Sequence, residues 1–196
     1  MDIYLLINVY NNHMILFILW ESWSWKTTLE HHLVNNYWFK MFKKYSTRPI
    51  RWDEDKSWYI HVWPAEILSM WAVWMIDECV KYNGEFYGMA IPHPIENDMK
   101  DTNYVVVLTE SWFQQFIDMD LEEEHEVVSI FLTNDNCEEL MRKRWDSEES
   151  ISRRLYLNNR MRNHMWMHMV ISWNGWTETV VELLKLQFPK LFTHVS

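Results

Sequence analysis

The hydrophobic and polar positions of this chain follow patterns that predict both helices and strands. Apolar residues recur at helical spacing over residues 63–84, with Pro64 suited to the first turn and Gly84 to the end of one long, largely buried helix. A continuous run rich in β-branched residues at 104–109 and a mainly apolar run at 127–132 predict two buried strands. The pattern therefore favours helices packed against a sheet.

The first third of the chain carries weaker patterns. Residues 3–25 are apolar apart from one polar break, and they predict either two short strands or a strand and a helix. The aromatic segment 37–45 predicts a strand, and the charged segment 46–62 predicts a loop. Residues 85–91 predict another strand.

The last third shows start and turn motifs. An acidic residue followed three positions later by Glu opens each of two predicted helices, at 135–145 and at 146–157. Asn174-Gly175 is the preferred two-residue turn of a hairpin, which we predict over residues 167–182. Residues 182–192 predict a short amphipathic tail.

Composition is consistent with one globular domain spanning residues 1–196. Hydrophobic residues make up 48% of the 196, which is enough for a core. The 14 Trp and 13 Met exceed ordinary usage, and we interpret most of them as core-filling side chains. The 3 glycines indicate a strongly diverged or compositionally biased chain.

Charge and cysteine usage limit the partners and the compartment. A net charge of −10 disfavours binding to nucleic acid and is compatible with a basic partner. Cys79 and Cys137 are too few for a disulfide scaffold, so we expect free thiols in a reducing compartment. The apolar run 14–20 is too short to span a bilayer, and no secretory signal is recognisable. We expect a cytoplasmic protein with no membrane contact.

The candidate chemistry is sparse. His164 and His168 are spaced for a zinc site on a helix, but the surrounding alternation predicts a strand, on which the two imidazoles would lie roughly 13 Å apart. Cys137, at a predicted helix start, is the better of two poor candidates for a nucleophile. The motifs G-x-S-x-G, G-x-G-x-x-G, H-E-x-x-H and the phosphate-binding loop are absent. We therefore predict no catalytic residue, no metal site and no cofactor.

The order of several short motifs resembles the N-terminal domain of the suppressor of fused family, over roughly residues 60–182. Residues 1–60 match only loosely. The motifs are Trp63-Pro64-Ala65-Glu66-Ile67-Leu68, Val107-Leu108-Thr109-Glu110, Val127-Val128-Ser129-Ile130-Phe131, Cys137-Glu138-Glu139-Leu140, and the segment around Asn174-Gly175. The resemblance implies an α+β domain, a mixed sheet flanked by helices, of the suppressor of fused type.

The same resemblance implies a non-catalytic protein that binds and sequesters or inhibits a protein partner. It places the partner-contacting residues at Trp74, Met89, Ile91 and His93. Because the chain is about one such domain long and acidic, a bacterial immunity-type protein is the favoured function. A Hedgehog-type negative regulator that binds a transcription-factor segment is the first alternative, and a small hydrolase is the second.

Overall fold

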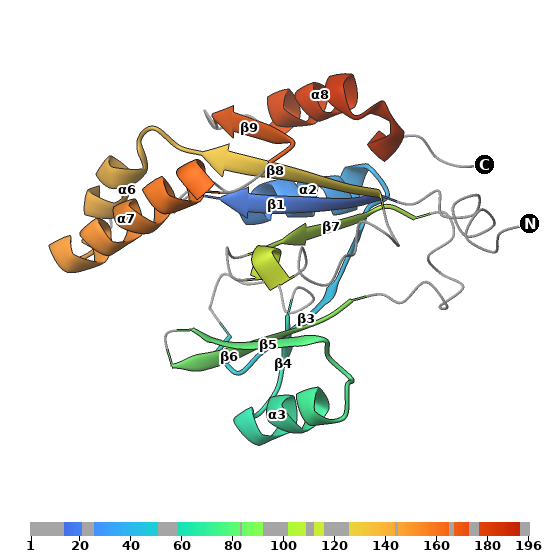
Figure 1. The fold of residues 1–196 in the computed structure, drawn as a ribbon, viewed down its shortest axis with the longest axis vertical. Coiled ribbons are helices and arrows are strands. Elements are labelled where there is room, and N and C mark those ends of the chain that lie inside the picture. The colour runs from blue at the N-terminus through green and yellow to red at the C-terminus, as the bar shows by residue number, and fades with distance from the viewer. Residues whose placement is uncertain are drawn as a thin grey trace, which may run out of the picture. The chain divides into compact units, whose positions relative to one another are not determined.

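The computed structural model describes residues 14–20, 26–50, 59–82, 84–91, 102–108, 112–115, 126–143, 145–164, 167–172 and 177–192. The chain divides into two compact units, one of residues Met1–Met41 with Lys100–Ser196 and one of residues Phe42–Met99. A single domain over residues 1–196 stays a prediction. Each unit has its own sheet, and the two are described separately below (Figure 1).

The first unit is built on a five-stranded sheet with the order β2-β7-β1-β8-β9. Its strands are β1 (Met14–Trp20), β2 (Lys40–Met41), β7 (Tyr104–Val107), β8 (Glu126–Thr133) and β9 (Met169–Ser172). All four neighbouring pairs are parallel, so the strands end at the same edge of the sheet. The two predicted buried strands are confirmed as β7 and β8, and the apolar run 14–20 forms the central strand β1.

Helices α2 (Lys26–Asn36) and α8 (Thr177–Gln187) pack against one face of this sheet, and the short helix η2 (Pro189–Phe192) follows α8 (Figure 1). Alternate residues of β1 point toward these helices because successive side chains of a strand face opposite sides. The core on this face includes Met14, Leu16, Ile18, Leu29, Leu33, Val105, Val128, Ile130, Leu132, Ile171, Val180, Val181, Leu184 and Leu191. The prediction of helices flanking a sheet is thus confirmed.

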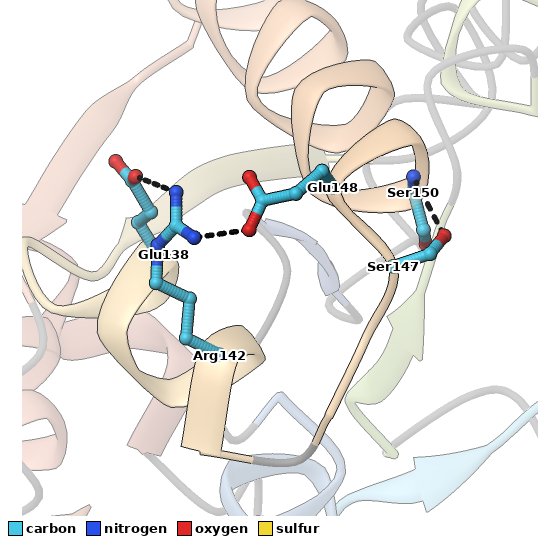
Figure 2. Close-up of polar contacts among 5 residues, drawn as sticks. All are labelled: Glu138, Arg142, Ser147, Glu148 and Ser150. Atoms are coloured by element: carbon cyan, nitrogen blue, oxygen red, sulfur yellow. Dashed lines mark hydrogen bonds and ion pairs between the residues drawn. The ribbon is translucent and has the colours of Figure 1, made fainter.

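Helices α6 (Cys137–Lys143) and α7 (Glu148–His164) follow β8 and share a small core of their own, Cys137, Met141, Ile151 and Leu155. Both were predicted, but α7 is capped one residue later than expected, where the Ser147 hydroxyl accepts a hydrogen bond of 3.2 Å from the Ser150 N–H. Figure 2 shows Arg142 of α6 between Glu138 and Glu148, so its guanidinium joins the two helices. These carboxylates, Glu138 first, raise the pKa of Arg142.

The second unit holds a four-stranded sheet with the order β4-β3-β6-β5 and one helix, α3 (Pro64–Ala72). Its strands are β3 (Lys43–Ser46), β4 (Ile60–His61), β5 (Glu78–Tyr82) and β6 (Glu85–Ala90). The β3–β4 pair is parallel and the other pairs are antiparallel, so this sheet is mixed. The strand predicted at 85–91 is confirmed as β6.

The long helix predicted over residues 63–84 is wrong. Helix α3 ends at Ala72, residues 78–82 form β5, and Gly84 lies in the turn between β5 and β6 with a φ of 88°. Three hydrogen bonds close the helix, and two of them run from the Trp74 N–H to the Trp71 carbonyl and from the Met75 N–H to the Met70 carbonyl. This pair of bonds is the Schellman motif, which normally has glycine where Trp74 stands.

Three tryptophans occupy left-handed backbone positions just after a helix. Trp38 follows α2, Trp74 follows α3 and Trp145 follows α6, with φ values of 63°, 58° and 66°. Their side chains are 74%, 83% and 93% exposed. The interpretation of tryptophan as core filler is therefore wrong at these positions, since each indole projects into solvent.

The hairpin predicted over residues 167–182 is also wrong. Strand β9 pairs in parallel with β8, and the next described element is α8, which contains residues 177–182 of the predicted second strand. Asn174 and Gly175 lie outside the described residues. The alternation that predicted the first strand of the hairpin was correct, but its partner strand comes from far earlier in the chain.

Candidate functional site

The first candidate site lies where β1 ends and α2 begins. From β1 the chain continues through α2 to β2, which lies on the β7 side of β1 in the strand order. From β8 it continues through α6 and α7 to β9, which lies in the opposite direction along the strand order. The neighbouring strands β1 and β8 thus form a topological switch point, which is where open parallel sheets bind ligands, beyond the carboxyl ends of the strands. Lys26 and Thr27 open α2 at this edge, with Lys26 half-buried and Thr27 exposed.

The spacing around Lys26 matches that of a phosphate-binding loop. That motif, G-x-x-x-x-G-K-[ST], follows a strand and opens a helix. Here the strand is β1, the helix is α2, and Lys26-Thr27 stand at the K-[ST] positions. The two glycine positions hold Trp20 and Trp25, which is why a search for the motif by its glycines missed it. Trp25 lies outside the described residues.

Polar side chains also lie at the ends of β8 and β9, at the same edge of the sheet. The Ser172 hydroxyl donates a hydrogen bond of 3.2 Å to the Asp135 carboxylate and so ties the end of β9 to the segment after β8. Asn134 is buried, and its side-chain oxygen accepts a hydrogen bond of 2.9 Å from the Asn136 N–H. These contacts fix the backbone between β8 and α6 beside the switch point.

The second candidate site is a group of cations and aromatic rings in the second unit. The Lys44 ammonium lies 5.4 Å and the Arg48 guanidinium 5.6 Å from the centre of the Tyr59 ring. The His61 Nδ1 donates a hydrogen bond of 2.9 Å to the Arg48 carbonyl oxygen, which holds the backbone of Arg48 against β4. Two positive groups around one aromatic ring in an acidic chain can bind an anionic ligand that carries a ring.

Lys44 belongs to a row of residues that crosses three strands. Lys44 of β3 is directly opposite Met89 of β6, and Met89 is directly opposite Glu78 of β5, so the three side chains share one face of the sheet. A Cβ added at Gly88 would meet Ile67 of α3, so Gly88 points toward α3 and the row points away from it. Burial, followed by the neighbouring Asp77, raises the pKa of Glu78.

The raised pKa of Glu78 predicts a pH-dependent effect of Glu78→Gln. Because the folded state holds the proton more tightly than the unfolded state, Glu78 disfavours folding increasingly as the pH rises above 4.5, its ordinary value. We expect Glu78→Gln to raise the melting temperature at pH 7 and to leave it unchanged at pH 3.5, measured by circular dichroism. The same shift at both pH values would contradict this.

The described members of the predicted partner-contact set differ in burial and direction. Met89 and Ile91 are buried, and the Ile91 N–H donates a hydrogen bond of 2.6 Å to the Asp77 carboxylate. Trp74 is exposed in the turn after α3, whereas Met89 points away from α3. His93 lies outside the described residues. As a binding set these four residues remain a prediction.

The histidine and cysteines considered as metal ligands or nucleophiles differ in their surroundings. The His168 Nδ1 accepts a hydrogen bond of 3.0 Å from the Ser129 N–H. Cys137 is buried and in no disulfide, and its Sγ accepts a hydrogen bond of 3.8 Å from the Asn158 side-chain amide. Cys79 is free and half-buried, but it lies in β5 rather than in a helix.

Within the described part of the chain, no three His, Cys, Asp or Glu side chains are grouped to hold a metal ion. None of the described helices is both long and apolar enough to cross a membrane.

Comparison with known proteins gives a match among solved structures. No family model matches the chain, and no curated protein matches it. Among solved structures, the crystal structure of guanylate kinase from Anaplasma phagocytophilum is similar, with a TM-score of 0.68 and 20% identity over 93% of this chain and 88% of that chain. The similarity therefore extends over almost the whole length of both chains.

This similarity corrects the suppressor of fused assignment. The matching fold is that of a nucleotide kinase, so the resemblance, the non-enzymatic immunity or Hedgehog-type function and the protein partner inferred from it are all wrong. The short motifs misled because each records a local helix start or buried strand, which many folds contain. The chain has the fold of guanylate kinase.

Proposed function

We propose that this chain is a nucleotide kinase that transfers a phosphoryl group from a nucleoside triphosphate to a nucleoside monophosphate. The observation that supports this most directly is Lys26-Thr27 at the first turn of α2, immediately beyond the central parallel strand, in a chain with the fold of guanylate kinase. In such a reaction, the terminal phosphorus–oxygen bond of the triphosphate breaks and a monophosphate oxygen bonds to the transferred group, which leaves two diphosphates.

The first unit supplies the groups for the triphosphate. The Lys26 ammonium neutralises phosphate charge, and the first N–H groups of the 11-residue helix α2 favour an anion at that helix end. Thr27 is the residue type whose hydroxyl binds Mg²⁺ in this motif, and Mg²⁺ supplies charge neutralisation on the phosphates when bound. Trp20 and Trp25 at the glycine positions weaken this binding, because the motif depends on close approach of the backbone to phosphate.

The second unit supplies the groups for the monophosphate. Arg48 and Lys44 offer positive charge, and Tyr59 offers an aromatic face for a base. A second cation–ring contact in this unit joins Lys81 and Phe86 of the β5–β6 hairpin, at 5.5 Å. The latter pair is less suited, because it has one cation rather than two.

The test is Lys26→Ala. We expect the rate of diphosphate formation from GTP or ATP and a monophosphate to fall about a hundredfold, because removal of one preorganised positive group costs a rate factor of that order. The matched control is Lys40→Ala, an exposed lysine of β2 that is opposite Tyr104 at the amino end of β7. Equal losses in both variants, or no phosphoryl transfer by the unmodified chain at high enzyme concentration, would refute the proposal.

A further inference from the structure

We propose that helix α3 of the second unit and the turn after it form the contact surface of a homodimer. This surface, called the α3 patch below, consists of six exposed large apolar side chains, Trp63, Leu68, Trp71, Val73, Trp74 and Met75. Exposed apolar side chains normally occur singly, and a contiguous group of them marks a binding surface. The occupant of the α3 patch is a second copy of this chain.

The sequence of α3 is apolar on both sides of the helix. Ile67 is buried, and its Cδ1 would lie 3.2 Å from a Cβ added at Gly88 of β6, so Ile67 points toward the sheet. Pro64, Leu68 and Trp71 recur at spacings of four and three residues, so they share another flank of the helix, and all three are exposed. A helix that is hydrophobic all round is normally buried all round. The pattern therefore indicates a covered flank at Leu68 and Trp71.

The α3 patch carries little charge in a strongly acidic chain. Residues 63–75 contain no Lys or Arg, and their one carboxylate, Glu66, is on the flank of α3 opposite Leu68 and Trp71. The Trp63 N–H donates a hydrogen bond of 3.3 Å to the Glu66 carboxylate, which keeps that carboxylate at the start of the helix. Two copies with a net charge of −10 repel each other, so they meet most easily through an uncharged surface.

The absence of basic residues also favours a second copy over a lipid surface. Helices that lie on membranes usually carry Lys and Arg, which attract anionic lipids. The segment 63–75 has neither residue type, and the whole chain is acidic. A second copy presents the same apolar side chains, so a two-fold contact joins patch to patch and needs no pairing of opposite charges.

The exposed area of the α3 patch is sufficient for a dimer. Trp63, Trp71 and Trp74 are 79%, 46% and 83% exposed, which corresponds to roughly 400 Å² at about 200 Å² for a whole tryptophan side chain. The other three side chains of the patch add roughly 150 Å². Two copies together bury about 1,100 Å², just above the roughly 1,000 Å² that a specific interface needs. We expect a dissociation constant of about 1–100 μM, because the interface is small.

The dimer leaves the proposed monophosphate site open. Gly88 points toward α3, whereas Lys44 and Met89 point to the other face of the same sheet. Dimerisation through the α3 patch and nucleotide binding are therefore separate properties, and either can fail without the other. At concentrations below the dissociation constant the chain is a monomer, and the side chains of the patch face water.

The experiment measures the mass of the full chain by sedimentation equilibrium over concentrations that span the expected dissociation constant. We expect Val73→Glu to weaken association at least about a hundredfold, because it places a carboxylate from each copy in an apolar contact. The matched control is Val170→Glu, which adds the same charge on β9 of the first unit, where Val170 is 62% exposed against 64% for Val73. This control should leave the dissociation constant nearly unchanged.

A second variant tests the apolar contact without added charge. Trp71→Ala should weaken association at least about tenfold, because tryptophans at the centre of an interface dominate its binding energy. Its matched control is Trp145→Ala, which removes an exposed indole of the first unit and should leave association unchanged. Circular dichroism checks the fold of each variant, and Val73→Glu decides the result if Trp71→Ala does not fold.

The outcomes that overturn the proposal are distinct. A chain that stays monomeric over the whole concentration range does not use the α3 patch for a dimer. A dimer that persists in Val73→Glu forms through another surface, and an equal loss in Val170→Glu attributes the effect to net charge. Binding of a monomeric chain to phosphatidylcholine vesicles, lost in Val73→Glu, would identify lipid as the occupant of the patch.

Discussion

Replacing Trp38, Trp74 and Trp145 together by glycine is expected to raise the free energy of unfolding by about 3 kcal/mol. Each tryptophan has a φ near 60°, where a Cβ atom costs roughly 1–2 kcal/mol. Glycine removes that cost but gains chain entropy in the unfolded state, which offsets about 0.5–1 kcal/mol. The net gain is about 1 kcal/mol per site, and the combined shift in melting temperature is about 6–12 °C for a chain of this size.

The hydrogen bonds at these helix ends explain why glycine belongs there. At the end of α6, the Trp145 N–H donates to the Arg142 carbonyl and the Asp146 N–H donates to the Met141 carbonyl, as at the end of α3. Both bonds require the left-handed residue between helix and loop, so the backbone keeps this conformation whatever side chain is present. Since the indoles are exposed, their removal takes little from the core.

Two controls separate backbone strain from loss of the indole. Trp63→Gly removes another exposed tryptophan, but Trp63 has a φ of −78° and should give no gain. Trp145→Ala removes the indole of Trp145 and keeps its Cβ, so it should recover little of the gain of Trp145→Gly. Urea unfolding followed by circular dichroism measures all variants. A gain in Trp145→Ala as large as in Trp145→Gly would show that the strain argument is wrong.

The double variant Trp20→Gly with Trp25→Gly is expected to bind nucleoside triphosphate about 10²–10⁴-fold more tightly than the unmodified chain. Both substitutions restore the glycines of the phosphate-binding motif ahead of Lys26. Two backbone N–H groups that gain hydrogen bonds to a charged phosphate contribute about 1.5–3 kcal/mol each, which corresponds to that range. Binding of ATP and GTP is measured by calorimetry in the presence of Mg²⁺.

The matched control is Trp23→Gly, a substitution in the same segment at a position that the motif leaves open. It adds a glycine and removes a tryptophan without restoring the motif, so its affinity for triphosphate should stay near that of the unmodified chain. An equal gain in Trp23→Gly would attribute the effect to general loosening of the segment. No gain in the double variant would count against phosphate binding at this edge of the sheet.

The sequence predicted the strands and helices whose local patterns are complete. Strands β7 and β8 are mainly apolar and mostly buried, and α6 and α7 begin near acidic first turns. The end of α3 could not be predicted, because its left-handed residue is Trp74 rather than glycine. Without a glycine at that position to mark the end of the helix, the predicted helix continued into β5. The apolar residues of β5 fit the spacing of a helix as well as that of a strand.

The sequence motifs did not identify the candidate sites, for a related reason. Lys26 and Thr27 stand at the right spacing, but a search that requires glycine at positions 20 and 25 finds nothing. A search for a lysine and a hydroxyl residue opening a helix after a buried strand would have found them. The row of Lys44, Met89 and Glu78 depends on the register of three strands, which the sequence does not specify locally. Met89 was predicted as a partner contact from the family resemblance, and it is the middle residue of this row.

The position of β1 at the centre of the parallel sheet affects how the chain reaches its fold. Strand β1 pairs only with β7 and β8, and its first described contact with the β7 side, Met14 to Asn103, spans 89 positions. High contact order slows folding, because long loops must close before pairing is rewarded. During synthesis, this apolar strand therefore leaves the ribosome long before its partners exist, and it stays exposed to aggregation or chaperones until they arrive.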